Sequence, residues 1–130
     1  MDRFPSVLEG ISDLSVDQIH FLLNLARKYK YNEVPIREFD GTKGPFRPII
    51  ATSFLENSTR TKHSFAIAIK KLDCIYLDFN AETSSLKKGE TLYDTLQTLS
   101  YQGVDLCIIR TNVSGQLNQF KEKNPIKIII

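Results

Sequence analysis

Long hydrophobic runs are missing from this sequence, and their absence excludes several classes of protein. No apolar stretch approaches the roughly 20 residues that a bilayer-spanning helix needs, so we expect no membrane association. The first residues show no basic segment followed by an apolar one, so no secretory signal peptide is predicted. We therefore expect a cytoplasmic protein.

Cysteine is scarce. Cys74 and Cys107 both lie inside apolar runs, and neither has Cys-x-x-Cys spacing. No cluster of His and Cys indicates a zinc site. We expect two buried, reduced thiols, because disulfides are rare in the cytosol. No metal and no other cofactor is predicted.

An excess of charge of one sign is also missing. Seventeen basic residues against fifteen acidic ones give a net charge of +2, which does not support a nucleic-acid partner or a polybasic membrane surface. The composition is that of a globular protein, with 42% hydrophobic and 25% charged residues. A chain of 130 residues is close to the commonest size of a single domain and can bury a core.

A capping box opens the first predicted helix. The Ser15 hydroxyl can accept from the backbone of Gln18, and the Gln18 side chain can reach back to the Ser15 amide. Behind it, apolar residues recur at the spacing of an amphipathic helix, namely Ile19, Leu22, Leu23, Ala26 and Tyr29. A polar segment rich in Pro and Gly follows, and we predict a loop there.

From residue 49 onward, short apolar runs alternate with helical patterns. Strands are predicted at 49–54, 74–79, 106–109 and 127–130, and helices at 61–72, 91–101 and 113–123. This alternation indicates βαβ units, and the nearly continuous apolar strands indicate a sheet covered on both faces. The predicted fold class is α/β, with an open parallel sheet of about four strands and helices on both faces.

Ligands bind outside the carboxyl ends of the strands in such sheets, so the residues after each strand are candidates. Ser58-Thr59-Arg60-Thr61 follows the first of these strands and begins a helix. The free amides of a helix N-terminus, three hydroxyls and a planar guanidinium suit a phosphate. The alternative is a simple N-cap with a solvated arginine. It leaves unexplained a cation in the first turn, where the helix dipole disfavours it.

Two other candidate groups follow the next two strands. The loop 80–89 contains Ser84 and Lys88, and its ordinary interpretation is a solvated polar loop. Arg110 ends the apolar run 106–109, where a charge would lie at the ligand-binding edge. No GxxxxGK[ST] motif is present, so a nucleotide-binding P-loop is a poor alternative.

Three segments resemble motifs of the aspartate and ornithine carbamoyltransferases, in the family's order and spacing. They are Phe54 to Phe65, Ser84 to Thr95, and Ile108-Ile109-Arg110. The second is similar to the aspartate enzymes, since the ornithine enzymes lack that serine and lysine loop. The resemblance runs from about Ser15 to Ile130. It implies that residues 1–130 form a single carbamoyl-phosphate-binding domain.

The resemblance also implies a role for each matching residue. Ser58 to Thr61 would bind the phosphate of carbamoyl phosphate, and Thr61 and Arg110 would contact its carbonyl oxygen. Ser84 and Lys88 would reach the active site of a neighbouring subunit in a homotrimer with shared sites, Lys88 contacting the phosphate and the aspartate carboxylate. The implied activity is transfer of the carbamoyl group to L-aspartate in pyrimidine biosynthesis. The residues implied in catalysis are Arg60, Thr61, Lys88 and Arg110.

The sequence departs from the family in two places. Thr111 stands where the family often has His, and the segment with the family's catalytic histidine would lie beyond residue 130. His20 and His63, on predicted helices, do not replace that histidine. We expect a C-terminally truncated chain that lacks the aspartate-binding domain and has no transferase activity alone. The alternative is a non-catalytic module that binds phosphate or carbamoyl phosphate.

Overall fold

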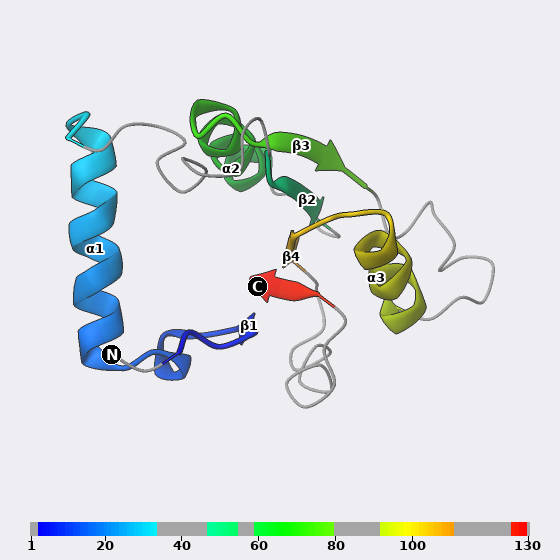
Figure 1. Cartoon of the computed structure of the whole chain (residues 1–130), viewed down its shortest axis with the longest axis horizontal. Helices are drawn as coiled ribbons and strands as arrows, with labels where there is room; N and C mark the ends of the chain where they lie inside the picture. Colours follow the sequence, from blue (N-terminus) through cyan, green and yellow to red (C-terminus); the bar gives the residue numbers. More distant parts are fainter. Residues whose placement is uncertain (1–2, 34–46, 55–58, 80–91, 111–125, 130) are drawn as a thin grey trace.

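A computed structural model describes residues 3–33, 47–54, 59–79, 92–110 and 126–129. Its centre is a parallel sheet of five strands in the order β1-β5-β4-β2-β3 (Figure 1). The predicted parallel α/β sheet is confirmed, with one strand more than expected. The strands are β1 (Val7–Leu8), β2 (Ile49–Phe54), β3 (Ile75–Asp78), β4 (Leu106–Arg110) and β5 (Lys127–Ile129).

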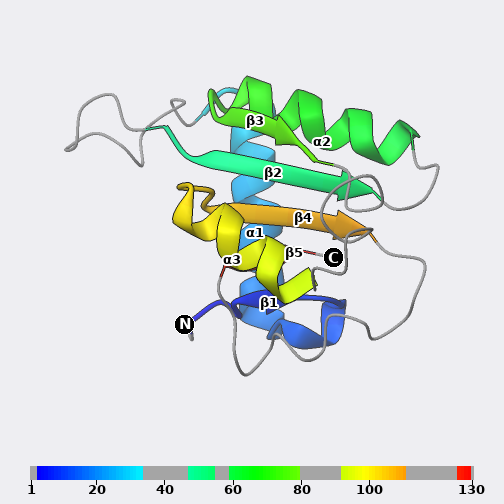
Figure 2. The ribbon, with the colours of Figure 1, turned by 90° about the vertical axis from the view of Figure 1, so that its right-hand side faces the viewer.

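The helices lie on both faces of the sheet, as predicted. Figure 1 shows α1 and α2 on one side and α3 on the other, and in Figure 2 α3 lies in front of the sheet with α1 behind it. The helix predicted at 113–123 lies outside the described residues. None of the described helices is long and apolar enough to cross a membrane. The helices are α1 (Val16–Lys30), α2 (Thr59–Lys71) and α3 (Leu92–Tyr101), with a short 3-10 helix at Ile11–Asp13.

The larger core lies between the sheet and α3. Leu96 and Leu99 of α3 pack over Ala51 of β2 and over Cys107 and Ile109 of β4. Alternate residues of a strand point to opposite faces, so Ile108 of β4 faces α2 instead. The buried residues of the α3 face are Val7, Ala51, Leu92, Leu96, Leu99, Val104, Cys107, Ile109, Ile126 and Ile128.

The core on the α2 face is smaller. Its buried members are Ile69, Cys74 and Ile108, and half-buried residues such as Phe54 and Phe65 surround them. The rings of Phe54 and Phe65 tilt against each other with centroids 6.3 Å apart, which ties α2 to the end of β2. Helix α2 thus packs along β2 and β3, as Figure 2 also shows.

Left-handed residues end both α2 and α3 and turn the chain into the next strand. Gly103 has φ of +100°, and the amide of Val104 donates to the carbonyl of Leu99 at 3.0 Å. Asp73 has φ of +57° at the equivalent place, where the Cys74 amide donates to the Ile69 carbonyl at 3.0 Å. These are Schellman turns. They start β3 and β4 at the edge of the sheet opposite the candidate site.

Helix α1 stands apart from the sheet (Figure 1). Its predicted capping box is confirmed: the Gln18 amide donates to Ser15 Oγ at 3.1 Å, and the Ser15 amide donates to Gln18 Oε1 at 2.8 Å. The apolar stripe predicted along the helix is largely open to solvent, since Leu23 is 65% exposed and Leu22 and Ala26 are also exposed. The helix is therefore set by its cap and by local contacts such as Phe4 with Phe21, whose ring centroids lie 6.0 Å apart.

Candidate anion-binding site

The carboxyl ends of β2, β3 and β4 meet at one edge, because these neighbouring strands are parallel. Phe54 at the end of β2 lies opposite Arg110 at the end of β4. Helix α2 begins at Thr59, two residues earlier than the sequence predicted. Thr59 and Arg60 take up helical geometry, so they belong to the first turn instead of preceding it. The edge therefore brings the N-terminus of α2 beside the end of β4.

Thr61 and Arg110 are the two predicted site residues that the structure places in contact. Arg110 Nη1 donates to Thr61 Oγ1 across 3.5 Å, which is long for a hydrogen bond. Arg110 is exposed and Thr61 half-buried. The two side chains come from elements 49 residues apart in the chain. Parallel pairing of β2 with β4 is what brings them together.

Thr59 and Arg60 lie on the exposed side of the same first turn. The turn offers hydroxyls, a guanidinium and the free amides of a helix N-terminus, and Arg110 adds a second guanidinium. Amides and guanidinium groups of this kind favour an anion with several oxygens. Three of the predicted site residues, Ser58, Ser84 and Lys88, lie outside the described residues. The binding roles of all seven stay predictions.

A second cation in the first turn of α2 is neutralised by a residue that the sequence analysis missed. Lys62 Nζ contacts Asp78 Oδ2 at 2.5 Å, and each side chain is 38% exposed. The hydrogen bond to Asp78, with the charge of the same carboxylate, raises the pKa of Lys62 above its usual 10.5. Asp78 Oδ1 also lies 3.2 Å from Oγ1 of the fully buried Thr52. The signal in the sequence was a carboxylate at the end of an otherwise apolar strand.

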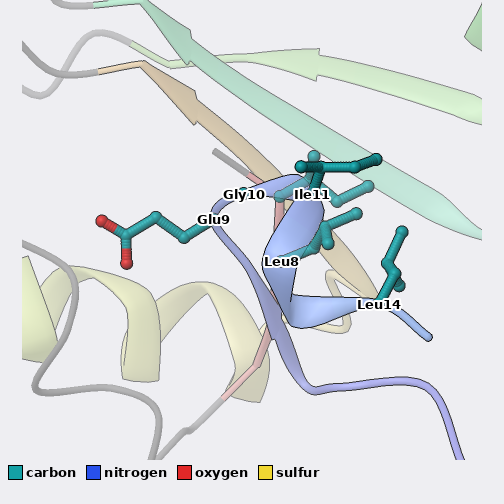
Figure 3. A pocket seen from close by; sticks show the side chains of 6 residues that line it. Leu8, Glu9, Gly10, Ile11 and Leu14 are labelled. Carbon is teal, nitrogen blue, oxygen red and sulfur yellow. The ribbon is translucent and has the colours of Figure 1, made fainter.

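The described residues form a hollow of about 220 Å³ elsewhere on the molecule, beside β1 and β5 (Figure 3). Its lining is mostly apolar, and Figure 3 shows the Glu9 carboxylate pointing away from Leu8, Ile11 and Leu14. The hollow is smaller than ordinary ligand pockets of about 300–1,000 Å³ and has few polar groups that could orient a ligand. It contains no residue of the candidate anion site. We therefore favour the open edge at α2, where the charged groups converge.

The cysteines and histidines do not extend the site. Cys74 and Cys107 are buried free thiols, as predicted. Burial raises the pKa of Cys107 from 9.0 to about 12, so this thiol stays protonated and unreactive near neutral pH. His20 and His63 are exposed on their helices. The described part of the chain holds no group of three or more His, Cys, Asp or Glu that could bind a metal ion.

Comparisons with known proteins agree with this geometry. Residues 8–130 match the family described as "Aspartate/ornithine carbamoyltransferase, carbamoyl-P binding domain". The aspartate carbamoyltransferase catalytic subunit of Staphylococcus epidermidis is 40% identical over 123 residues, which are 95% of this chain and 39% of that protein. The chain therefore spans about two-fifths of the length of this relative.

Solved structures give the same result. The catalytic subunit of M. jannaschii aspartate transcarbamoylase matches with a TM-score of 0.72 and 31% identity, over 95% of this chain and 40% of that one. Aspartate transcarbamoylase from Trypanosoma cruzi, in complex with aspartate and phosphate, matches with a TM-score of 0.74 and 25% identity, over 98% of this chain and 40% of that one. By the family match and by these relatives, the chain belongs to the aspartate/ornithine carbamoyltransferase family, whose carbamoyl-P binding domain it matches.

Proposed function

We propose that this chain binds carbamoyl phosphate at the first turn of α2, and that the protein containing it transfers the carbamoyl group to L-aspartate. The observation that carries the proposal is the 3.5 Å approach of the Arg110 guanidinium to Thr61 Oγ1 at a helix N-terminus. This arrangement can receive both ends of a small acyl phosphate. The relatives named above support aspartate as the acceptor, because they are aspartate enzymes.

The reaction needs positive charge at two places. The amine of aspartate attacks the carbamoyl carbon, an oxyanion develops, the bond from that carbon to the phosphate oxygen breaks, and the amine loses a proton. In this proposal Ser58 to Thr61 hold the departing phosphate, while Thr61 and Arg110 meet the charge on the carbonyl oxygen. Removing one such donor typically costs about 2.7–4 kcal/mol of transition-state stabilisation. Arg60, Thr61 and Arg110 thus act by electrostatics and orientation, together with Lys88.

Ser84 and Lys88 complete the site from a neighbouring copy in this proposal, which makes the protein a homotrimer with shared sites. The edge strand β3, which leads into residues 80–91, supports contact with a second copy. Its Ile75 and Leu77 are 40% and 39% exposed, and by their register with Ile49 and Ala51 they lie on the α3 side of the sheet. Apolar side chains on an exposed edge strand favour association. Sedimentation equilibrium measures the subunit number directly. The cytoplasmic location and the single-domain assignment of residues 1–130 also stay predictions.

Arg60→Ala tests the binding site. Inorganic phosphate, titrated into the chain, is expected to shift the amide signals of Thr59 to Thr61 in nuclear magnetic resonance spectra. Loss of a charge-assisted contact worth about 1.5–3 kcal/mol should weaken binding about 10- to 150-fold in the variant. Arg27→Ala is the matched control, because Arg27 is an exposed arginine on α1, far along the chain from α2, whose side chain donates to Asn24.

Two outcomes would contradict the proposal. Amide signals that do not move in the unsubstituted chain would exclude an anion site at α2, and equal loss in the two arginine variants would make the effect non-specific. Turnover is tested separately, in the protein that contains this chain, by measuring carbamoyl-aspartate formation. Binding without turnover there would favour the non-catalytic module.

A further inference from the structure

The first turn of α2 is tied to the strands on both sides of β2. Thr61 contacts Arg110 at the end of β4, and the next residue, Lys62, contacts Asp78 at the end of β3. Because the sheet order is β4-β2-β3, these two contacts lie on opposite sides of the helix start. Consecutive residues of a helix point about 100° apart, which lets neighbours reach different strands. The first turn of α2 is therefore held by contacts on both sides.

The Lys62–Asp78 contact on the β3 side continues into the sheet. Thr52 of β2 lies opposite Asp78 in the strand register, and its Oγ1 is 3.2 Å from Asp78 Oδ1 and 3.2 Å from the Tyr76 hydroxyl oxygen. A carboxylate only accepts hydrogen bonds, so the single proton of Thr52 is best donated to Asp78. Thr52 is 0% exposed and cannot move without disturbing β2. The carboxylate that holds Lys62 is thus itself held by the core.

We propose that Lys62 and Asp78 are a positioning pair, which fixes the first turn of α2 so that Thr59, Arg60 and Thr61 face the bound anion. This inference rests on the proposed function, because it assigns a purpose to the placement of that turn. Lys62 Nζ contacts Asp78 at 2.5 Å, so Lys62 is directed toward the carboxylate. In this proposal the backbone amides, Arg60 and Arg110 bind the anion. The pair also offsets a cation that the helix dipole disfavours at this end.

The sign of one measurement separates positioning from direct electrostatics. Asp78→Asn removes a negative charge near the site and releases Lys62, so Coulomb's law alone predicts tighter phosphate binding. A positioning pair predicts weaker binding, by about fivefold. Lys62→Met should give a similar loss. The double variant should lose no more than either single one, because both remove the same contact.

Hydrogen exchange supplies a readout that needs no ligand. The amides of residues 63–66 donate to the carbonyls of residues 59–62 in an α-helix, so their exchange reports fraying of the first turn. We expect faster exchange there in Asp78→Asn and Lys62→Met, with unchanged exchange in α3. Lys62→Arg keeps a charge that can reach Asp78 and should restore both slow exchange and binding. If Asp78→Asn fails to fold, the comparison of Lys62→Arg with Lys62→Met still tests the positioning pair.

The outcomes are distinguishable from failure of the proposed function. If the unsubstituted chain does not bind phosphate, the proposed function is wrong, and the exchange data still test whether Lys62 and Asp78 fix the first turn of α2. If the chain binds phosphate, tighter binding or unchanged exchange in Asp78→Asn overturns the positioning pair alone. Tighter binding in Asp78→Asn with weaker binding in Lys62→Met would make Lys62 a direct ligand.

Discussion

The two faces of the sheet differ in the side chains that pack on them. The α3 face is an apolar core of ten buried residues, from Val7 to Ile128. The α2 face buries three apolar residues, Ile69, Cys74 and Ile108, and adds a polar row in which Lys62, Asp78, Thr52 and Tyr76 connect the helix to β2 and β3. Lys70 extends this row, with Nζ 5.6 Å from the centre of the Tyr76 ring.

This difference gives the two faces different roles. The apolar α3 face contributes most of the stability, and the polar contacts of the α2 face fix the position of α2. Apolar packing is non-directional, so it holds α3 firmly without fixing its register very closely. Hydrogen bonds and ion pairs have narrow geometry, and they join α2 to particular positions on β3 and β4. The helix that carries the candidate site is therefore the one that the polar contacts locate. Three predictions test whether the faces differ as described.

Leu96→Ala should have the largest effect. Leu96 is 0% exposed at the centre of the α3 face, and truncation of such a leucine typically costs about 3–5 kcal/mol of unfolding free energy. Leu72→Ala is the matched change on the α2 face, where Leu72 is half-buried, and it should cost about 1–2 kcal/mol. Urea unfolding measures both. Equal losses would remove the contrast between the faces.

The two cysteines give the second comparison, since each face holds one. The folded pKa of Cys107 is raised by burial to about 12, whereas an unfolded thiol ionises near 9.0. Between these pH values the folded state binds the extra proton, so the unfolding free energy should fall by about 1.4 kcal/mol per pH unit. This slope should disappear in Cys107→Ala.

Cys74 is the internal control for that experiment. Burial, with a smaller effect from Asp73, also raises the pKa of Cys74, but it is much less deeply enclosed. Cys74→Ala should therefore change the alkaline slope less than Cys107→Ala does. Unfolding between pH 8 and 10.5 under reducing conditions provides the measurement. A larger change from Cys74→Ala would show that the α2 face is the more deeply buried one.

Thr52→Val should have the smallest effect on stability. The change keeps the shape but removes the hydroxyl that Asp78 and Tyr76 contact, which costs about 1 kcal/mol because both partners retain some access to water. The loss should fall on α2, with faster amide exchange at residues 63–66 and little change in α3. Equally faster exchange in α2 and α3 would contradict the conclusion that the polar row fixes the position of α2.

Much of the fold could be predicted because the apolar runs are strong signals. The run at 49–54 forms a strand with the predicted limits, the one at 74–79 is shorter by one residue at each end, and the one at 106–109 is longer by one residue. The run at 127–130 forms β5 as far as Ile129, and residue 130 lies outside the described residues. Strand β1 was missed because Val7–Leu8 is too short for any periodicity, and it forms only by pairing with β5. The strand order likewise depends on tertiary contacts that no local pattern contains.

The candidate site could be predicted in part. The rule that ligands bind at carboxyl ends selected Thr61 and Arg110, and the structure places them in contact. Lys62 and Asp78 were missed because their pairing depends on how α2 lies across β3. The apolar stripe of α1 shows the converse limit. Its spacing correctly predicted a helix, yet Leu23 is 65% exposed, because periodicity does not reveal what lies beside a helix.

The strand order also affects how the chain folds as it is synthesised. Val7 and Leu8 leave the ribosome before their partners, Ile128 and Ile129, so β1 cannot pair until β5 has been made. Among the described strands, β5 lies between β1 and β4 and is made last. The segment from β2 to β4 can pair while synthesis continues, because its contacts are closer in sequence. Strand β5 can therefore join β1 to a sheet that β2, β3 and β4 have already begun.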